Sequence, residues 1–293
     1  MVHVKAAAKI NLFLHVTGRR DDGYHLLRSL VCFSDLHDVI TITGADDFSF
    51  SVSGQFCGLL GDNHEDNLVV RAAKLSAKIT GCDLTCGIHL EKNLPVGAGI
   101  GGGSADAAAV ICGLLQYWNV DFSGHIRRAI MQQAASLGAD IPVCLHGGSA
   151  IMSGIGENIT AVDIPENMHA LLVYPAVHIN TPEIFKRFDS PFNLSWDDDC
   201  TAKLQNVQKD GFYALLDNAQ NDLNAYAVQI APQIGDLLDD MKALSGCRMA
   251  RMTGSGSSCF ALFDDAAKAK AAREQIKKIR PDYWAETTIF NAA

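Results

Sequence analysis

A glycine-rich segment followed at once by a helical pattern constrains the fold of this chain more than any other feature. Residues 95–103 include five glycines, and apolar residues then recur at positions 107, 108, 111, 114, 115 and 118. Glycine allows positive φ and leaves backbone N–H groups open to an anion, and a helix start adds unpaired N–H groups and a positive dipole end. The sequence therefore predicts a strand, a phosphate-binding loop and a helix, with Ser104 or Asp106 capping the first helical turn.

Several kinds of glycine-rich segment can be compared with this one. Gly97, Gly99 and Gly102 match G-x-G-x-x-G, and Asp121 lies near the position of a ribose-binding acid. However, the helical pattern continues to Trp118 and leaves too little room for the second strand of a dinucleotide-binding fold. No G-x-x-x-x-G-K-[ST] sequence occurs, and a flexible linker would not join a strongly periodic helix directly. The segment is therefore interpreted as a different nucleotide-binding loop.

Length and charge limit the classes of protein to be considered. A chain of 293 residues favours two folded units. A second glycine-rich stretch after residue 147 predicts an N-terminal nucleotide-binding domain at 1–155 and a C-terminal substrate-contacting domain at 156–293. The net charge of −9, with 24 Lys and Arg against 33 Asp and Glu, argues against nucleic-acid binding, which needs clustered cations.

Cysteine usage and hydropathy indicate a cytoplasmic protein. The nine cysteines are an odd number scattered through apolar stretches, so they are predicted to be reduced and mostly buried. Cys82 and Cys86 have no second ligand pair beside them, so no metal site is predicted. No segment reaches the roughly 18 apolar residues of a membrane span. The alternating segment 10–16 lacks a signal-peptide cleavage site, and no membrane association is expected.

Hydrophobic periodicity predicts an α+β protein. Residues 24–30 fit either a short helix or an extended link, and 180–199 are predicted to be a loop. Strands are predicted over 2–16, 38–43, 48–52, 84–90, 170–174 and 285–290, with a strand–turn–strand unit over 247–263. Helices are predicted from 104 to 118 and over 67–80, 126–137, 222–231, 234–245 and 266–279.

The glycine-rich segment resembles the nucleotide loop of the GHMP kinases, P-x-x-x-G-L-G-S-S-x-A. Three further blocks agree with that family in its order: AKINL at 8–12 with RDDGYH at 20–25, GADIP at 138–142, and TGSGSS at 253–258. The resemblance extends over nearly the whole chain. Ala98, Ile100 and Ala105 are the departures from the residues usual in the loop.

This resemblance implies a two-domain α+β architecture with the active site in the cleft between the domains. It also implies that ATP phosphorylates the 2-hydroxyl of the small molecule 4-diphosphocytidyl-2-C-methyl-D-erythritol, in the non-mevalonate isoprenoid pathway. Mg²⁺ is expected from the chemistry of ATP rather than from a ligand cluster. Two alternatives stay open: another GHMP kinase acting on homoserine, mevalonate or a sugar, and a non-catalytic nucleotide-binding sensor. A dinucleotide oxidoreductase is more distant.

Two residues in the family blocks are candidates for catalysis. Asp140 lies on a bend between Gly138 and Pro142, where a helix is about to start, and we expect it to accept the hydroxyl proton. Lys9 lies in an otherwise apolar strand and beside Asp140 would keep the carboxylate ionised and favour the developing alkoxide. A surface lysine and a helix-capping aspartate are the structural alternatives.

The resemblance also assigns binding residues. Tyr24 and Phe185 are expected to stack on the two faces of a cytosine, and His25 to read its edge, although aromatic residues covering a small core are an alternative. The tight turn at 254–256 could support the nucleotide loop or the substrate phosphates. The residues expected to bind ATP are Pro95, Gly97, Gly99, Gly101, Gly102, Gly103, Ser104 and Ala105. Those expected to bind the substrate are Asn11, Tyr24, His25, Thr181, Phe185, Gly254 and Ser255.

Overall fold

The structure is a computed structural model that describes residues 1–61, 63–204 and 207–291, and these form two compact units. The first unit comprises Met1–Ala8, Leu36–Val96 and Gly101–Gly147. The second comprises Lys9–Asp35, Gly97–Ile100 and the described residues from Gly148 onward. These units differ from the two consecutive segments predicted, 1–155 and 156–293, because strands β1 (Val2–Arg19) and β2 (His25–Gly44) each belong partly to both.

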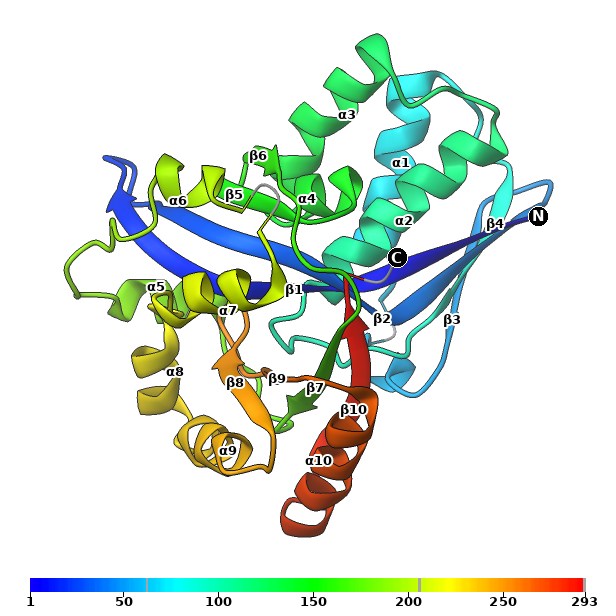
Figure 1. Cartoon of the computed structure of the whole chain (residues 1–293). Coiled ribbons are helices and arrows are strands. Elements are labelled where there is room, and N and C mark those ends of the chain that lie inside the picture. Colours follow the sequence, from blue (N-terminus) through cyan, green and yellow to red (C-terminus); the bar gives the residue numbers. More distant parts are fainter. Residues whose placement is uncertain (62, 205–206, 292–293) are drawn as a thin grey trace. The chain divides into compact units, whose positions relative to one another are not determined.

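In the first unit, helices pack against a small sheet. Strand β2 pairs antiparallel with β4, with Ile40 opposite Leu90, and β3 lies parallel to β4. One apolar cluster joins these strands to all four helices, and Figure 1 shows α1, α2 and α3 lying together. The elements are β3 (Ser49–Ser53), a 3₁₀ helix (Cys57–Leu59), α1 (Leu68–Thr80), β4 (Cys86–Glu91), α2 (Gly102–Tyr117), α3 (Gly124–Leu137) and α4 (Ile141–His146).

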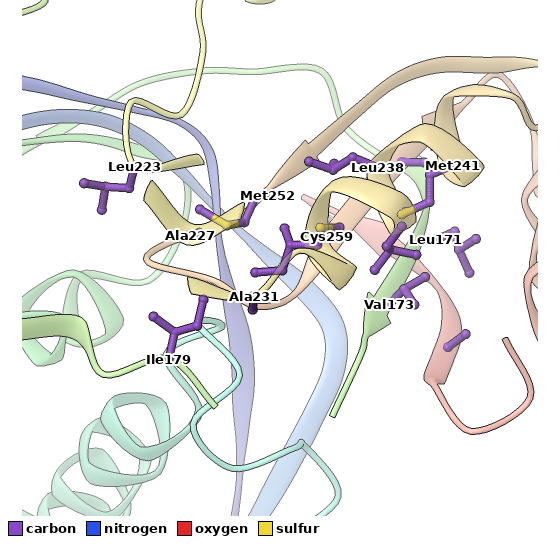
Figure 2. Packing of buried hydrophobic residues seen from close by; sticks show 14 of the residues in the cluster. Leu171, Val173, Ile179, Leu223, Ala227, Ala231, Leu238, Met241, Met252 and Cys259 are labelled. Atoms are coloured by element: carbon purple, nitrogen blue, oxygen red, sulfur yellow. The ribbon is translucent and has the colours of Figure 1, made fainter. Parts of the chain in front are cut away.

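In the second unit, an antiparallel sheet in the order β10-β7-β9-β8 carries helices, and β10 continues to β2 through Phe290 opposite Ser34. Side chains of α8 and α9, among them Ala227 and Met241, pack with Leu171 of β7 (Figure 2). The strands are β5 (Ala150–Gly154), β6 (Asn158–Ala161), β7 (Met168–Tyr174), β8 (Cys247–Met252), β9 (Cys259–Phe263) and β10 (Trp284–Phe290). The helices are α5 (Thr181–Arg187), α6 (Asp198–Ala202), α7 (Lys209–Asp217), α8 (Asn224–Ile230), α9 (Gln233–Lys242) and α10 (Ala266–Ile279).

Local sequence signals set several helix ends as predicted. The Asn67 side chain accepts a hydrogen bond from Val69 N (2.9 Å) to cap α1, and Gly81 ends that helix with a φ of +74°. Of the two possibilities for residues 24–30, the extended one is correct for 25–30, which belong to strand β2. The prediction of a loop at 180–199 was wrong in part, because this segment contains α5.

The cysteines are thiols, as predicted, but only three of the nine are fully buried and six are half-buried. Among the helices that the structure describes, none combines the length and the apolar character needed to cross a bilayer.

Candidate active site

The predicted site residues are distributed over both units. The first unit holds Pro95, Gly101, Gly102, Gly103, Ser104, Ala105 and Asp140. The second holds Lys9, Asn11, Tyr24, His25, Gly97, Gly99, Thr181, Phe185, Gly254 and Ser255.

In the second unit, the first half of the glycine-rich loop is held by backbone contacts. Lys9 N donates to Ile100 O (2.9 Å), and Ser258 N donates to Ala98 O (3.1 Å). Gly254 has a φ of +58°, and a Cβ at this position would lie 2.5 Å from Gly99 O. Only glycine fits such an approach without displacement of the backbone. The turn at 254–256 therefore supports residues 98–100, which agrees with the first of the two roles expected for it.

In the first unit, the second half of the loop leads directly into α2. Gly101 is the N-cap with a φ of +64°, and the helix begins at Gly102. The prediction that Ser104 or Asp106 caps the first turn was wrong, because the left-handed backbone of Gly101 starts the helix before both residues. The first N–H groups of α2 thus follow the glycines immediately, as anion binding at a helix start requires.

The bend that precedes Asp140 lies close to the start of α2. A Cβ at Gly138 would lie 3.5 Å from Ser104 Oγ, so the bend adjoins the first turn of α2. Asp140 is the N-cap of α4, but its side chain makes no capping hydrogen bond to the helix backbone, all of which is described. The helix-capping alternative therefore does not account for its carboxylate.

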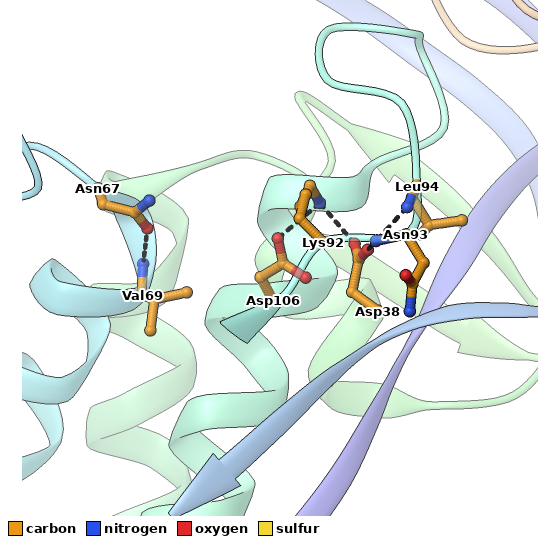
Figure 3. Close-up of polar contacts among 7 residues, drawn as sticks. All are labelled: Asp38, Asn67, Val69, Lys92, Asn93, Leu94 and Asp106. Atoms are coloured by element: carbon orange, nitrogen blue, oxygen red, sulfur yellow. Dashed lines mark hydrogen bonds and ion pairs between the residues drawn. The ribbon is translucent and has the colours of Figure 1, made fainter. Parts of the chain in front are cut away.

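A buried charged cluster, which the sequence analysis missed, lies next to the loop in the first unit (Figure 3). Lys92 Nζ is 2.5 Å from Asp38 Oδ2 and 2.8 Å from Asp106 Oδ2, and all three side chains are almost completely buried. Burial raises the pKa of Asp106 to about 8, although the positive charge of Lys92 opposes the shift. Burial by itself would lower the pKa of Lys92, but Asp106 and Asp38 raise it.

In the second unit, Lys9 begins a directional chain of hydrogen bonds. Lys9 Nζ donates to Asn11 Oδ1 (2.8 Å), Asn11 Nδ2 donates to Ser29 Oγ (2.7 Å), and Ser29 Oγ donates to Phe13 O (2.5 Å). Because the hydroxyl proton of Ser29 is used on the carbonyl of Phe13, Ser29 Oγ can only accept from Asn11. This fixes the amide of Asn11 with its oxygen toward Lys9. Asn11 N also donates to Thr253 Oγ1 (2.8 Å).

Two of the residues predicted to contact a base also contact each other. The rings of His25 and Phe185 stack with centroids 5.4 Å apart and an interplanar angle of 26°. Burial, assisted by the positive charge of Arg19, lowers the pKa of His25, so its ring is neutral at neutral pH. Tyr24 is 63% exposed and therefore covers no core. Thr181 Oγ1 is 2.8 Å from Ser255 Oγ, which joins α5 to the turn at 254–256.

The predicted binding residues do not line a cavity that the second unit contains. A cavity of about 730 Å³ there is lined by residues 190–195, 219–222 and 250–252, among others, and by none of the predicted site residues. Among the described residues, no three or more His, Cys, Asp or Glu side chains gather as ligands for a metal ion.

Comparison with known proteins places the chain in a family. It matches "GHMP kinases N terminal domain" over residues 67–148 and "GHMP kinases C terminal" over residues 204–281. The chain belongs to the GHMP kinases, and it is an ATP-dependent small-molecule kinase. This agrees with the predicted α+β two-domain architecture and is incompatible with a dinucleotide oxidoreductase.

Particular members of the family are similar to the chain over almost its whole length. The 4-diphosphocytidyl-2-C-methyl-D-erythritol kinase of Paramagnetospirillum magneticum is 40% identical over 281 residues, covering 96% of this chain and 95% of that protein. The enzyme of the same name from Agrobacterium fabrum is 41% identical, covering 97% and 94%. A crystal structure of 4-(cytidine 5'-diphospho)-2C-methyl-D-erythritol kinase has a TM-score of 0.77 at 28% identity, covering 99% and 100%. The fold is shared with homoserine kinase from Cytophaga hutchinsonii, whose crystal structure has a TM-score of 0.72 at 17% identity. That match covers 99% of this chain and 95% of that chain.

Proposed function

We propose that this kinase transfers the γ-phosphoryl group of ATP to the 2-hydroxyl of 4-diphosphocytidyl-2-C-methyl-D-erythritol, a step of the non-mevalonate route to isopentenyl diphosphate. The observation that carries the proposal is identity of about 40% with enzymes of that name over nearly the full length of both chains. A kinase for homoserine or mevalonate is less well supported, because such structures match at 17% identity or less. We place the enzyme and its small-molecule substrate in the cytoplasm.

In this proposal the glycine-rich loop and the start of α2 bind the phosphates of ATP. The backbone N–H groups that follow Gly101 have no partner inside the helix and suit phosphate oxygens. Mg²⁺ bound with ATP would neutralise part of the phosphate charge. Ser104 is the residue that would hold it: its hydroxyl is not used as the N-cap of α2, and a hydroxyl oxygen suits a hard cation.

Asp140 and Lys9 have the catalytic roles in the proposal. The carboxylate of Asp140 accepts the proton of the substrate hydroxyl. Lys9 supplies positive charge to the developing alkoxide, and its ammonium group is kept in one place by Asn11 Oδ1. The 3% exposure of Lys9 supports a functional role over a surface lysine, because a buried lysine is rare unless it is paired.

The aromatic residues of the second unit provide the base specificity in the proposal. The neutral ring of His25 has one nitrogen that donates and one that accepts, which suits the edge of a cytosine. The stacked pair of His25 and Phe185 forms an aromatic surface, and exposed Tyr24 offers a second face. Base stacking on aromatic side chains contributes about 1–3 kcal/mol per base.

A coupled assay of ADP release tests the proposed function. ADP should form from ATP on addition of 4-diphosphocytidyl-2-C-methyl-D-erythritol, and not on addition of homoserine or mevalonate. Asp140→Asn should lower turnover by about two to four orders of magnitude and leave MgADP affinity unchanged. Asp121→Asn, the same change at an exposed aspartate of the first unit, is the control and should be fully active. Preference for another alcohol would refute the assignment of the substrate.

A further inference from the structure

The Lys92 cluster connects the chain before the glycine-rich loop with the chain after it. Asp38 Oδ1 accepts backbone hydrogen bonds from Asn93 N (2.5 Å) and Leu94 N (2.8 Å), directly before the loop. Its other oxygen, Oδ2, accepts from Lys92 Nζ, which also donates to Asp106 Oδ2, just after the first turn of α2. One chain of polar contacts therefore runs from the entry of the loop to its exit (Figure 3).

The position of Lys92 relates this cluster to the helix start itself. A Cβ at Gly102 would lie 3.2 Å from Lys92 Nζ, so the ammonium group lies directly behind the first residue of α2. Asp106 Oδ1 is buried and has no hydrogen-bond partner among the described residues. Because buried ion pairs can often be replaced by apolar residues at little cost, stability alone does not explain why this cluster is charged.

We infer that Asp38, Lys92 and Asp106 are positioning residues that hold both ends of the glycine-rich loop in the geometry that binds ATP. The inference rests on the proposed function in that it takes this loop to be the ATP phosphate site. The loop has glycines with positive φ at Gly97, Gly99 and Gly101, and glycine loses more conformational entropy on ordering than any other residue. Fixing both ends before ATP arrives reduces the entropy lost on binding.

The charge state of Asp106 supports this role. The raised pKa of Asp106 favours its protonated form, which places less negative charge behind a site that must accept phosphates. Both contacts of Lys92 can then persist in the buried environment, and the loop ends remain joined.

The test measures MgADP binding by calorimetry, without any alcohol substrate. Asp106→Ala should weaken MgADP binding by about tenfold or more, because a misplaced binding group is costly even when it is remote from the chemistry. Asp106→Asn keeps an oxygen that accepts from Lys92, so this variant should bind MgADP as tightly as the unaltered chain does. In the coupled assay, Asp106→Ala should raise KM for ATP while KM for 4-diphosphocytidyl-2-C-methyl-D-erythritol stays unchanged. Leu114→Ala, a fully buried change farther along α2, is the control; it should lower the melting temperature without weakening MgADP binding.

The outcomes separate this inference from the proposed function. Unchanged MgADP affinity in folded Asp106→Ala, or equal weakening by Leu114→Ala, would overturn the positioning role even if the alcohol substrate is correct. Normal MgADP results with no turnover of that substrate would overturn only the substrate. If Asp106→Ala melts below the assay temperature, Asp106→Val, which fills more of the space, is measured against the same two outcomes. Absence of MgADP binding by the unaltered chain would overturn both proposals.

Discussion

Replacement of Ser29 by alanine tests how strongly the rate depends on the placement of Lys9. The change removes the acceptor of Asn11 Nδ2 and the donor to Phe13 O, both in a fully buried position. Each unsatisfied buried group costs about 1–3 kcal/mol, so the free energy of unfolding should fall by about 2–6 kcal/mol if neither finds a new partner. The amide of Asn11 is then no longer fixed with its oxygen toward Lys9. Because misplacement by about 1 Å can cost about a hundredfold in rate, we expect kcat to fall by about tenfold to a hundredfold.

The measurement is kcat and KM in the coupled assay, with unfolding by urea measured in parallel. Ser76→Ala is the matched control: Ser76 is equally buried, donates to Ala72 O (2.9 Å) and lies in α1, so it should lose stability but keep kcat. In an Asn11→Ala background, Ser29→Ala should cost little further activity, because the hydrogen-bond chain is already broken. A full kcat for Ser29→Ala, or an equal loss with and without Asn11, would refute the reasoning.

Three further predictions concern other parts of the site. A residue other than glycine in the left-handed backbone conformation costs roughly 1–2 kcal/mol. Gly254→Ala should lower the free energy of unfolding by more than this, because its Cβ would also lie 2.5 Å from Gly99 O. Gly124→Ala is the control, because Gly124 has a φ of +52° but open space around it, and urea unfolding should show a smaller loss of stability for this variant. An equal loss of stability in the two variants would contradict the close contact between residue 254 and Gly99 O. Tyr24→Ala should raise substrate KM by about tenfold to a hundredfold without a change in melting temperature, and a lowered melting temperature would indicate a packing role instead. The pKa of Asp106 is about 8 in the folded chain, against an ordinary value of 3.8. The stability that its protonated form contributes is therefore complete below about pH 4 and is lost as the pH rises to about 8. The free energy of unfolding falls over this range by up to about 1.4 kcal/mol per pH unit. Asp106→Asn should remove this part of the pH dependence of urea unfolding, and an unaltered dependence would show that Asp106 is ionised.

The parts of the site that follow from local pattern could be predicted from the sequence. The glycine-rich loop before a periodic helix was found from neighbouring residues, and so was α10, whose bounds the apolar spacing predicts. The start of α2 was misplaced because a glycine N-cap carries no side chain to mark it. Asn67, whose side chain makes the capping hydrogen bond itself, marked the start of α1 correctly.

The partners of the site residues could not be predicted in the same way. Ser29 lies 18 residues from Asn11, and Thr253 lies 242 residues from it, so no local pattern contains these contacts. Lys92 and Asp106 occupy segments that look like an ordinary strand end and helix start. Their only sequence signal is a charged residue beside apolar ones, which an exposed position explains equally well.

The sharing of β1 and β2 between the units has a consequence for synthesis on the ribosome. The chain passes from one unit to the other at five points, after residues 8, 35, 96, 100 and 147. Residues 9–35 leave the ribosome early, but Leu14 N donates to Gln220 O and Val16 N donates to Asp222 Oδ2, and these acceptors emerge about 200 residues later. Strand β1 can pair with β2 early, but the contacts of Leu14 and Val16 with residues 220–222 cannot form until most of the chain has been made. Unlike a protein of two consecutive domains, this kinase completes the contacts of its first strand only late in translation, and a truncation from the C-terminal end that reaches residues 220–222 removes partners of that strand.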